Sequence, residues 1–99
     1  TSSPESIEQA KKEVQEKYNG QLDILVNNAG IADVVKSVEV ARKIFATNYY
    51  GAKLVAERFA DLIRENGRII NVASEVGAWT LFDMSKELQE KYQATDLTK

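Results

Sequence analysis

The chain has 99 residues, of which 43% are hydrophobic and 28% charged, and its formal net charge is −2. This length allows one domain at most, and the charge gives no basic field that would attract nucleic acid or an anionic membrane. Cysteine and histidine are absent, which excludes disulfides, thiolate metal sites and the commonest zinc ligand. We therefore expect no metal site, and proton transfer would need Tyr, Lys, Asp, Glu or a hydroxyl relay.

The first predicted elements are a helix and a short strand. Pro4 lies in the first helical turn after two serines, and Asn19-Gly20 supply a left-handed stop. Residues 22–26 then form a short apolar run between turn residues, which is typical of a strand buried on both faces of a parallel sheet. The apolar residues of the helix recur at helical spacing: Ile7, Ala10, Val14 and Tyr18.

A long helix, a second strand and a final helix follow. Residues 35–63 carry the strongest 3.6-residue apolar period, and Asn66-Gly67 end this segment. Residues 68–73 form the second apolar strand, and residues 83–93 have near-helical spacing. The apolar residues Trp79, Leu81, Phe82 and Met84 are expected in a loop that lines a pocket, joins a core or contacts another subunit.

Strands that alternate with crossover-length helices imply parallel pairing and right-handed connections. The fold class is therefore α/β, a portion of a doubly wound, Rossmann-like parallel sheet with two strands and flanking helices. Two parallel strands are too few for a stable open sheet, and the chain starts at Thr1 instead of Met. We therefore expect residues 1–99 to be a single partial domain, the central part of a larger sheet.

Both strands end in turns of small and polar residues, at 27–30 and 73–77. Ligands of open parallel sheets bind at the carboxyl ends of the strands, and small residues let a ligand approach the backbone closely. Asn and Gly are also common in turns that bind nothing. Two such turns at one edge of one sheet favour a ligand-binding groove.

Three motifs resemble those of short-chain dehydrogenases/reductases. Residues 22–31, with Asn27-Asn28-Ala29-Gly30, resemble the family's strand and NNAG turn, and residues 47–51 resemble its helix motif with a catalytic Asn. Residues 67–74, with Gly77, resemble the strand that ends in the catalytic Ser. The tail at 86–92 resembles a helical insertion of monomeric carbonyl reductases, which points to NADPH as the cofactor and to a monomeric parent protein.

The resemblance implies a role for each matching residue. Asn28, Ala29 and Gly30 would line the cofactor groove. Ser74 would donate a hydrogen bond to a substrate carbonyl, and Asn48 would bind a water that feeds a proton relay. The substrates would be small carbonyl compounds, namely aldehydes, ketones or quinones. An Asn48 that is simply buried and bonded within its helix is the structural alternative.

Two parts of the family pattern lie outside the chain. The Gly-rich phosphate turn is expected upstream of Thr1, and the Tyr-x-x-x-Lys pair beyond Lys99. Tyr49 and Lys53 match that spacing, but they overlap the Asn48 motif and precede Ser74, so we do not assign them this role. We therefore expect the isolated chain to be inactive.

Two functions of other classes stay open. The chain could be a non-catalytic interaction module, in which the 37–63 helix packs against a second copy as a homo-oligomer. It could also be a nucleotide-sensing regulator on the same fold. No apolar run reaches the length of a membrane span and no signal-peptide pattern is present, which predicts a cytoplasmic protein.

Overall fold

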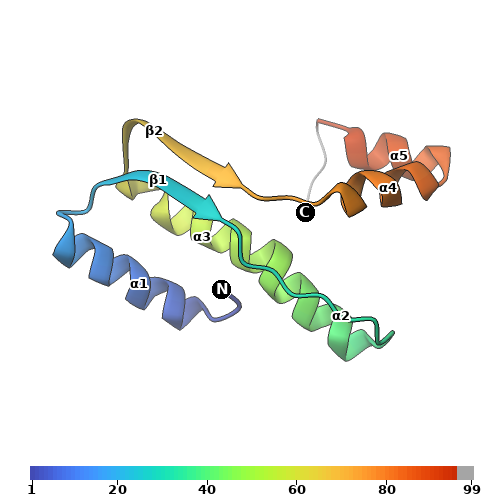
Figure 1. The fold of residues 1–99 in the computed structure, drawn as a ribbon, viewed down its shortest axis with the longest axis horizontal. Helices are drawn as coiled ribbons and strands as arrows, with labels where there is room; N and C mark the ends of the chain where they lie inside the picture. The colour runs from blue at the N-terminus through green and yellow to red at the C-terminus, as the bar shows by residue number, and fades with distance from the viewer. Residues whose placement is uncertain (96–99) are drawn as a thin grey trace.

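The computed structural model describes residues 1–95, and Figure 1 shows their arrangement. Asn19 and Gly20 have positive φ angles of 55° and 68°, so the first predicted Asn-Gly stop is a left-handed turn. Asn66 also has a positive φ of 64°, but it lies inside the strand Ile63–Asn71, so it does not end the preceding helix as predicted. The elements in chain order are α1 (Pro4–Lys17), β1 (Leu22–Asn27), α2 (Val38–Phe45), the π-helical turn η1 (Ala46–Gly51), α3 (Ala52–Phe59), the 3₁₀ turn η2 (Ala60–Leu62), β2 (Ile63–Asn71), α4 (Glu75–Asp83) and α5 (Lys86–Gln93).

The sheet consists of β1 and β2 in parallel, which confirms the predicted α/β class. The pairing is regular from Ile24 opposite Arg68 to Asn27 opposite Asn71. Nearer the start of the strands the register is irregular. Leu22 pairs with Ile63 and Ile24 pairs with Arg68, so residues 64–67 of β2 bulge opposite the single residue Asp23 of β1. The regular part of β2 therefore begins at the position that the sequence predicts.

One face of the sheet is covered. Helices α1 and α3 lie side by side beneath the strands, and α3 contacts both α1 and β1 (Figure 1). The buried hydrophobic residues come from α1, α3 and η2: Ile7, Phe59 and Leu62. Partly buried residues that surround them are Val14, Leu22, Leu25, Leu54 and Val55. The core therefore lies at the amino-terminal end of the strands.

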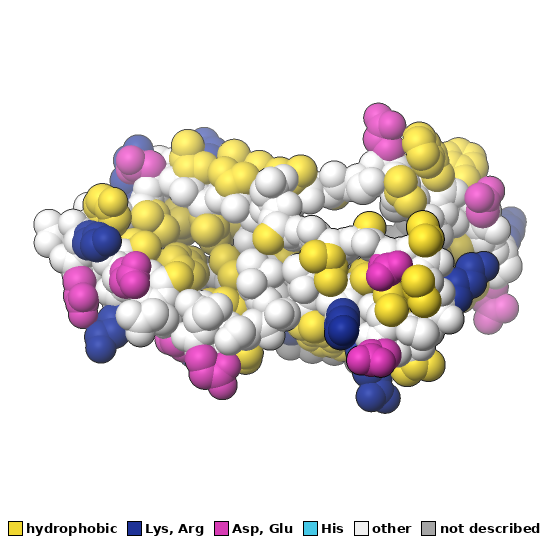
Figure 2. Space-filling view, turned by 60° about the horizontal axis from the view of Figure 1, so that its bottom comes forward, with side chains coloured by type: hydrophobic (Ala, Val, Ile, Leu, Met, Phe, Trp, Pro, Cys, Tyr) yellow, Lys and Arg dark blue, Asp and Glu magenta, His cyan; other side chains and the backbone are white. Residues whose placement is uncertain are grey.

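The other face of the sheet is open. Ile24 is 56% exposed and Val26 53% exposed, and Ile70, which pairs with Val26, is 45% exposed. Burial on both faces was expected, and the described residues do not provide it, because no helix among them packs on this side. Figure 2 shows many hydrophobic side chains at the surface. The pattern that predicts two-sided burial is present in the sequence, but only one layer of helices is present to satisfy it.

The predicted 35–63 helix is not a single α-helix. It begins at Val38, where Ser37 caps the first turn, and it widens into the π-helical turn at residues 46–51 before continuing as α3. A π-helical turn within a longer helix needs a local cause and often marks a functional position. Here the turn contains Asn48, whose contacts are described below.

Residues 75–83 form the helix α4, where the sequence predicted an apolar loop. Helix α5 then begins at Lys86, three residues later than predicted, because the Ser85 hydroxyl accepts the Leu88 N–H and caps its first turn. Both helices lie at the end of the molecule opposite α1 (Figure 1). The radius of gyration is 16.1 Å, whereas a compact domain of this length has about 13 Å. The described chain is therefore elongated.

Candidate functional site

The turns after the two strands lie next to each other, as the parallel order predicts. The Val72 N–H donates to the Asn27 carbonyl at 2.9 Å and extends the ladder beyond β2. The Asn27 amide donates to the Asn71 side chain at 3.1 Å and to the Ala52 carbonyl at 3.2 Å. These bonds tie the end of β1 both to β2 and to the start of α3.

Asn48 fixes the turn that follows β1. Its Oδ1 accepts the Ile31 N–H at 2.8 Å, and its Nδ2 donates to the Ile31 carbonyl at 2.8 Å. Both ends of the amide thus bind one backbone residue 17 positions away. The alternative that Asn48 is buried and bonded within its own helix is wrong, because its side chain is exposed and bonds to Ile31. The contact also gives the π-helical turn a local cause, since it holds the helix against the loop at this residue.

Ser74 lies at the start of α4 and has two hydrogen-bonding capacities. Its Oγ accepts the Val76 N–H at 3.2 Å and caps the helix. Among residues 1–95, no acceptor takes the hydroxyl proton, and the side chain is exposed. The oxygen is therefore held in place while its O–H can donate to another molecule.

A cavity of about 890 Å³ brings Ser74 and Asn48 together. Three segments form its walls: the loop after β1, the end of α2 with η1, and the segment from Ser74 through α4. A hollow between the α2 end and the α4–α5 end is visible on the right of Figure 2. The other lining residues are Ile31, Ala32, Asp33, Ile44, Phe45, Val76, Gly77, Thr80 and Met84.

The predicted cofactor-binding residues Asn28, Ala29 and Gly30 do not line the cavity that contains Ser74. Ala29 lines a smaller cavity of about 330 Å³, which also has Asn48 in its wall. Asn28 and Gly30 line neither of these cavities, although both are exposed at the same edge. A Cβ on Gly30 would meet the Asn48 side chain, at 3.5 Å from Oδ1 and 3.9 Å from Cγ. The exposed backbone of Ala29 and Gly30 fits the close approach of a flat or charged group.

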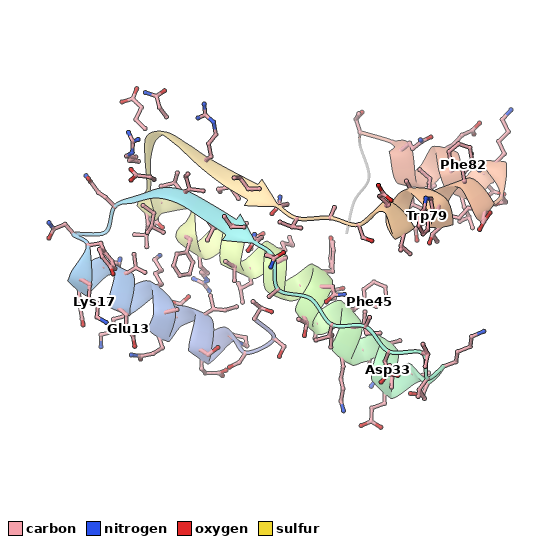
Figure 3. The ribbon with its side chains drawn as sticks, viewed as in Figure 1. Glu13, Lys17, Asp33, Phe45, Trp79 and Phe82 are labelled. Atoms are coloured by element: carbon pink, nitrogen blue, oxygen red, sulfur yellow. The ribbon has the colours of Figure 1, made fainter. Side chains whose placement is uncertain are left out.

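Sequence reasoning missed several residues of the larger cavity, above all Asp33 and Phe45. Both belong to segments without a family motif, and only the fold brings them near Ser74. Of the apolar residues that the sequence suggested as pocket wall, core or subunit contact, Met84 lines the cavity, whereas Trp79 and Phe82 line neither the cavity nor the core. They are 61% and 85% exposed on α4, and Figure 3 shows them at the far end of the molecule from α1.

Other kinds of site receive no support from residues 1–95. No group of three or more acidic residues is arranged to hold a metal ion in this part of the chain, and the sequence has no His or Cys to add. Within the same residues, no helix has both the length and the apolar character needed to cross a membrane.

Comparisons with known proteins identify the family. "Carbonyl reductase [NADPH] 1" of Mus musculus is 36% identical over 103 residues, which cover 97% of this chain and 36% of that protein. The Bos taurus protein of the same name is 35% identical over 99 residues, covering 96% of this chain and 35% of the relative. "Carbonyl reductase [NADPH] 3" of Rattus norvegicus is 32% identical over 100 residues. The chain thus spans about a third of the length of these relatives. The profile of the short chain dehydrogenases matches residues 1–94, and the chain belongs to this family.

Proposed function

We propose that this chain is the central segment of an oxidoreductase that reduces aldehydes, ketones or quinones with hydride from NADPH. The observation that carries the proposal is the Ser74 hydroxyl, whose oxygen is fixed by the Val76 N–H while its proton points to no acceptor among residues 1–95. It lines an open cavity with Asn48 at the carboxyl ends of the two strands. The names of the relatives support NADPH and a carbonyl substrate.

The proposed chemistry of Ser74 follows from the charge that develops during reduction. Bound NADPH would supply the hydride to the carbonyl carbon, and negative charge would then grow on the carbonyl oxygen. A fixed O–H donor stabilises that charge without reorganisation at the moment of reaction. The Val76 N–H keeps the Ser74 oxygen in place, and a hydroxyl that accepts one hydrogen bond is still able to donate another.

The proposed role of Asn48 is to position the edge of the site. Its side-chain amide donates one hydrogen bond to the Ile31 backbone and accepts one from it. A water of a proton relay would then bind to the remaining capacity of the amide or to a backbone carbonyl of the widened η1 turn. Asn28, Ala29 and Gly30 would form the floor of the cofactor groove next to this held turn. The final proton donor would come from a residue outside the chain.

Replacement of Ser74 tests the proposal in the full polypeptide that carries this segment. Ser74→Ala removes the donor and should lower kcat about 10²–10³-fold while NADPH affinity changes little. The readout is the carbonyl-dependent oxidation of NADPH, with cofactor binding measured separately by fluorescence.

The matched control is Ser85→Ala, which removes the same kind of helix cap from α5. Each cap contributes about 1 kcal/mol to stability, so both variants should be destabilised alike, but only the Ser74 variant should lose turnover. Equal loss of turnover in the two variants, or loss of NADPH binding with turnover retained, would refute the role of Ser74.

A second candidate function is self-association through α2 and η1. An apolar groove of about 450 Å³ runs along these elements, with Val38, Phe45 and Tyr50 in its wall. These side chains are 71%, 59% and 61% exposed. Sedimentation of the full polypeptide tests self-association. A dimer that the Tyr50→Glu substitution dissociates supports this function, and a monomer refutes it.

A further inference from the structure

The wall of the Ser74 cavity contains a single charged side chain among the described residues. Most of its wall is apolar, and the polar groups besides the two proposed site residues are few. Among the described residues that line it, Asp33 alone carries a charge. A carboxylate in the wall of a cavity attracts cations and repels anions, and at an exposed residue such as Asp33 water screens this interaction.

The Asp33 carboxylate is held by its own loop. Its Oδ1 accepts the Val35 N–H at 2.9 Å, which fixes the side chain and leaves the second oxygen available. Two residues earlier, Ile31 is anchored on both sides by Asn48. No ion pair of Asp33 is found among residues 1–95. The loop therefore presents an uncompensated negative charge from a backbone that is fixed close to the proposed site.

An aromatic ring adds a second feature that favours a cation. Phe45 lines the same cavity from the end of α2, and 59% of it is exposed. Figure 3 shows Asp33 in the loop before α2, near the start of that helix, and Phe45 at the other end of the helix. The face of an aromatic ring attracts ammonium groups, and a quaternary ammonium also gains from the apolar surroundings.

We propose that Asp33 determines substrate class, so that the cavity prefers apolar carbonyl compounds with an alkylammonium group over those with a carboxylate. This inference rests on the proposed carbonyl reduction at Ser74. At contact distance the interaction of two unit charges across water corresponds to roughly a fivefold change in binding. Raised salt should reduce this preference, since the cavity is open to solvent.

The test uses three aryl aldehydes that differ only at the end of one short alkoxy chain. The end group is trimethylammonium, its uncharged isostere tert-butyl, or carboxylate. The alkoxy chain keeps the charge away from the reacting carbonyl, so that intrinsic reactivity is the same. The measured quantity is the ratio of kcat/KM values within one preparation of the full polypeptide, which cancels any difference in the folded fraction.

In the Asp33→Asn variant the ratio of the ammonium to the tert-butyl compound should fall roughly fivefold, and the ratio of carboxylate to tert-butyl should rise by a similar factor. Asparagine keeps the acceptor for the Val35 N–H. The control Glu13→Gln makes the same change of net charge on α1, far from Asp33 (Figure 3), and should leave both ratios unchanged.

Unchanged ratios in Asp33→Asn, or an equal shift in Glu13→Gln, would overturn the inference while the reductase activity stands. If the unmodified polypeptide reduces none of the three aldehydes, the proposed function and the inference are both overturned.

Discussion

The two turns at the carboxyl edge of the sheet are held in different ways. The turn after β1 is tied by side chains, because Asn27 bonds to Asn71 and Ala52, and Asn48 bonds twice to Ile31. The turn after β2 continues the ladder for one residue at Val72, and among residues 1–95 Ser74 then bonds only within its own helix, to the Val76 and Gly77 N–H groups. The chain thus fixes its proposed cofactor edge by itself and presents Ser74 from a less constrained segment.

The same contrast appears in the packing on either side of the turns. α1, α3 and η2 supply all the buried hydrophobic side chains among the described residues. α4 and α5 bury none of theirs, and Trp79 and Phe82 are largely exposed. A segment with few buried contacts opens at low free energy. Binding of cofactor or substrate can therefore order the Ser74 segment more than the turn after β1.

The largest expected difference in the free energy of unfolding is between alanine substitutions at two glycines, Gly67 in β2 and Gly77 in α4. A Cβ on Gly67 would lie 2.5 Å from the Ile63 Cγ2 and 2.8 Å from the Asp23 carbonyl oxygen. Because a backbone atom cannot move aside, Gly67→Ala should lower the free energy of unfolding by about 3 kcal/mol.

Gly77→Ala is the matched substitution in α4. A Cβ there would meet nothing within 4 Å, and alanine is the better helix former by up to about 1 kcal/mol. This variant should therefore be neutral or slightly stabilised. Urea unfolding of both variants of the full polypeptide checks the pair, and a Gly77 variant as unstable as the Gly67 variant would mean that α4 is packed as tightly as β2.

A smaller effect is expected at Asn48. Asn48→Ala removes two hydrogen bonds to Ile31. Water can replace part of this interaction in an exposed turn, so the loss of stability should be about 1–2 kcal/mol. The neighbouring Thr47 has no side-chain hydrogen bond among residues 1–95, and Thr47→Ala serves as the control in the same urea experiment. If the two variants lose the same stability, the Asn48 contact does not hold the turn.

The smallest effect is expected at the ion pair that joins α1 to η2. Lys11 Nζ lies 3.3 Å from Asp61 Oδ1, and the Asp61 side chain is 67% exposed. Such a pair contributes about 0.5 kcal/mol, and added salt weakens it. Lys11→Met keeps the apolar stem packed and should change the melting temperature only slightly more than Lys12→Met does at low salt. A much larger drop in melting temperature for Lys11→Met would show that the packing of α1 against η2 depends on charge instead of on the apolar core.

Much of the fold could be predicted from the sequence, and the exceptions share a cause. Periodicity and the Asn-Gly stops predict the order of elements, the parallel pairing and the point at which β2 becomes regular. The π-helical turn could not be predicted, because it is tied to a contact between Asn48 and Ile31, which are 17 residues apart. The helix α4 was also missed, because its apolar residues stay exposed instead of forming one buried stripe.

The candidate site could be predicted only in part, because some of its residues are brought together by the fold and carry no motif. The resemblance to family motifs pointed to Ser74 and Asn48, and both line the wall of one cavity. Asp33 lies in a segment between motifs, so that only the course of the loop shows that it lines the same cavity. The roles of Asn28, Ala29 and Gly30 in cofactor binding stay predictions.

Hydrogen exchange at two backbone amides of the full polypeptide tests the central comparison most directly. The Ile31 N–H is held by Asn48, and the Val76 N–H by Ser74. We predict that the Ile31 amide is protected with or without NADPH, whereas the Val76 amide exchanges quickly alone and gains protection when NADPH and a carbonyl compound bind. Equal protection of both amides without any ligand would contradict the account, because the Ser74 segment would then be as well held as the turn after β1.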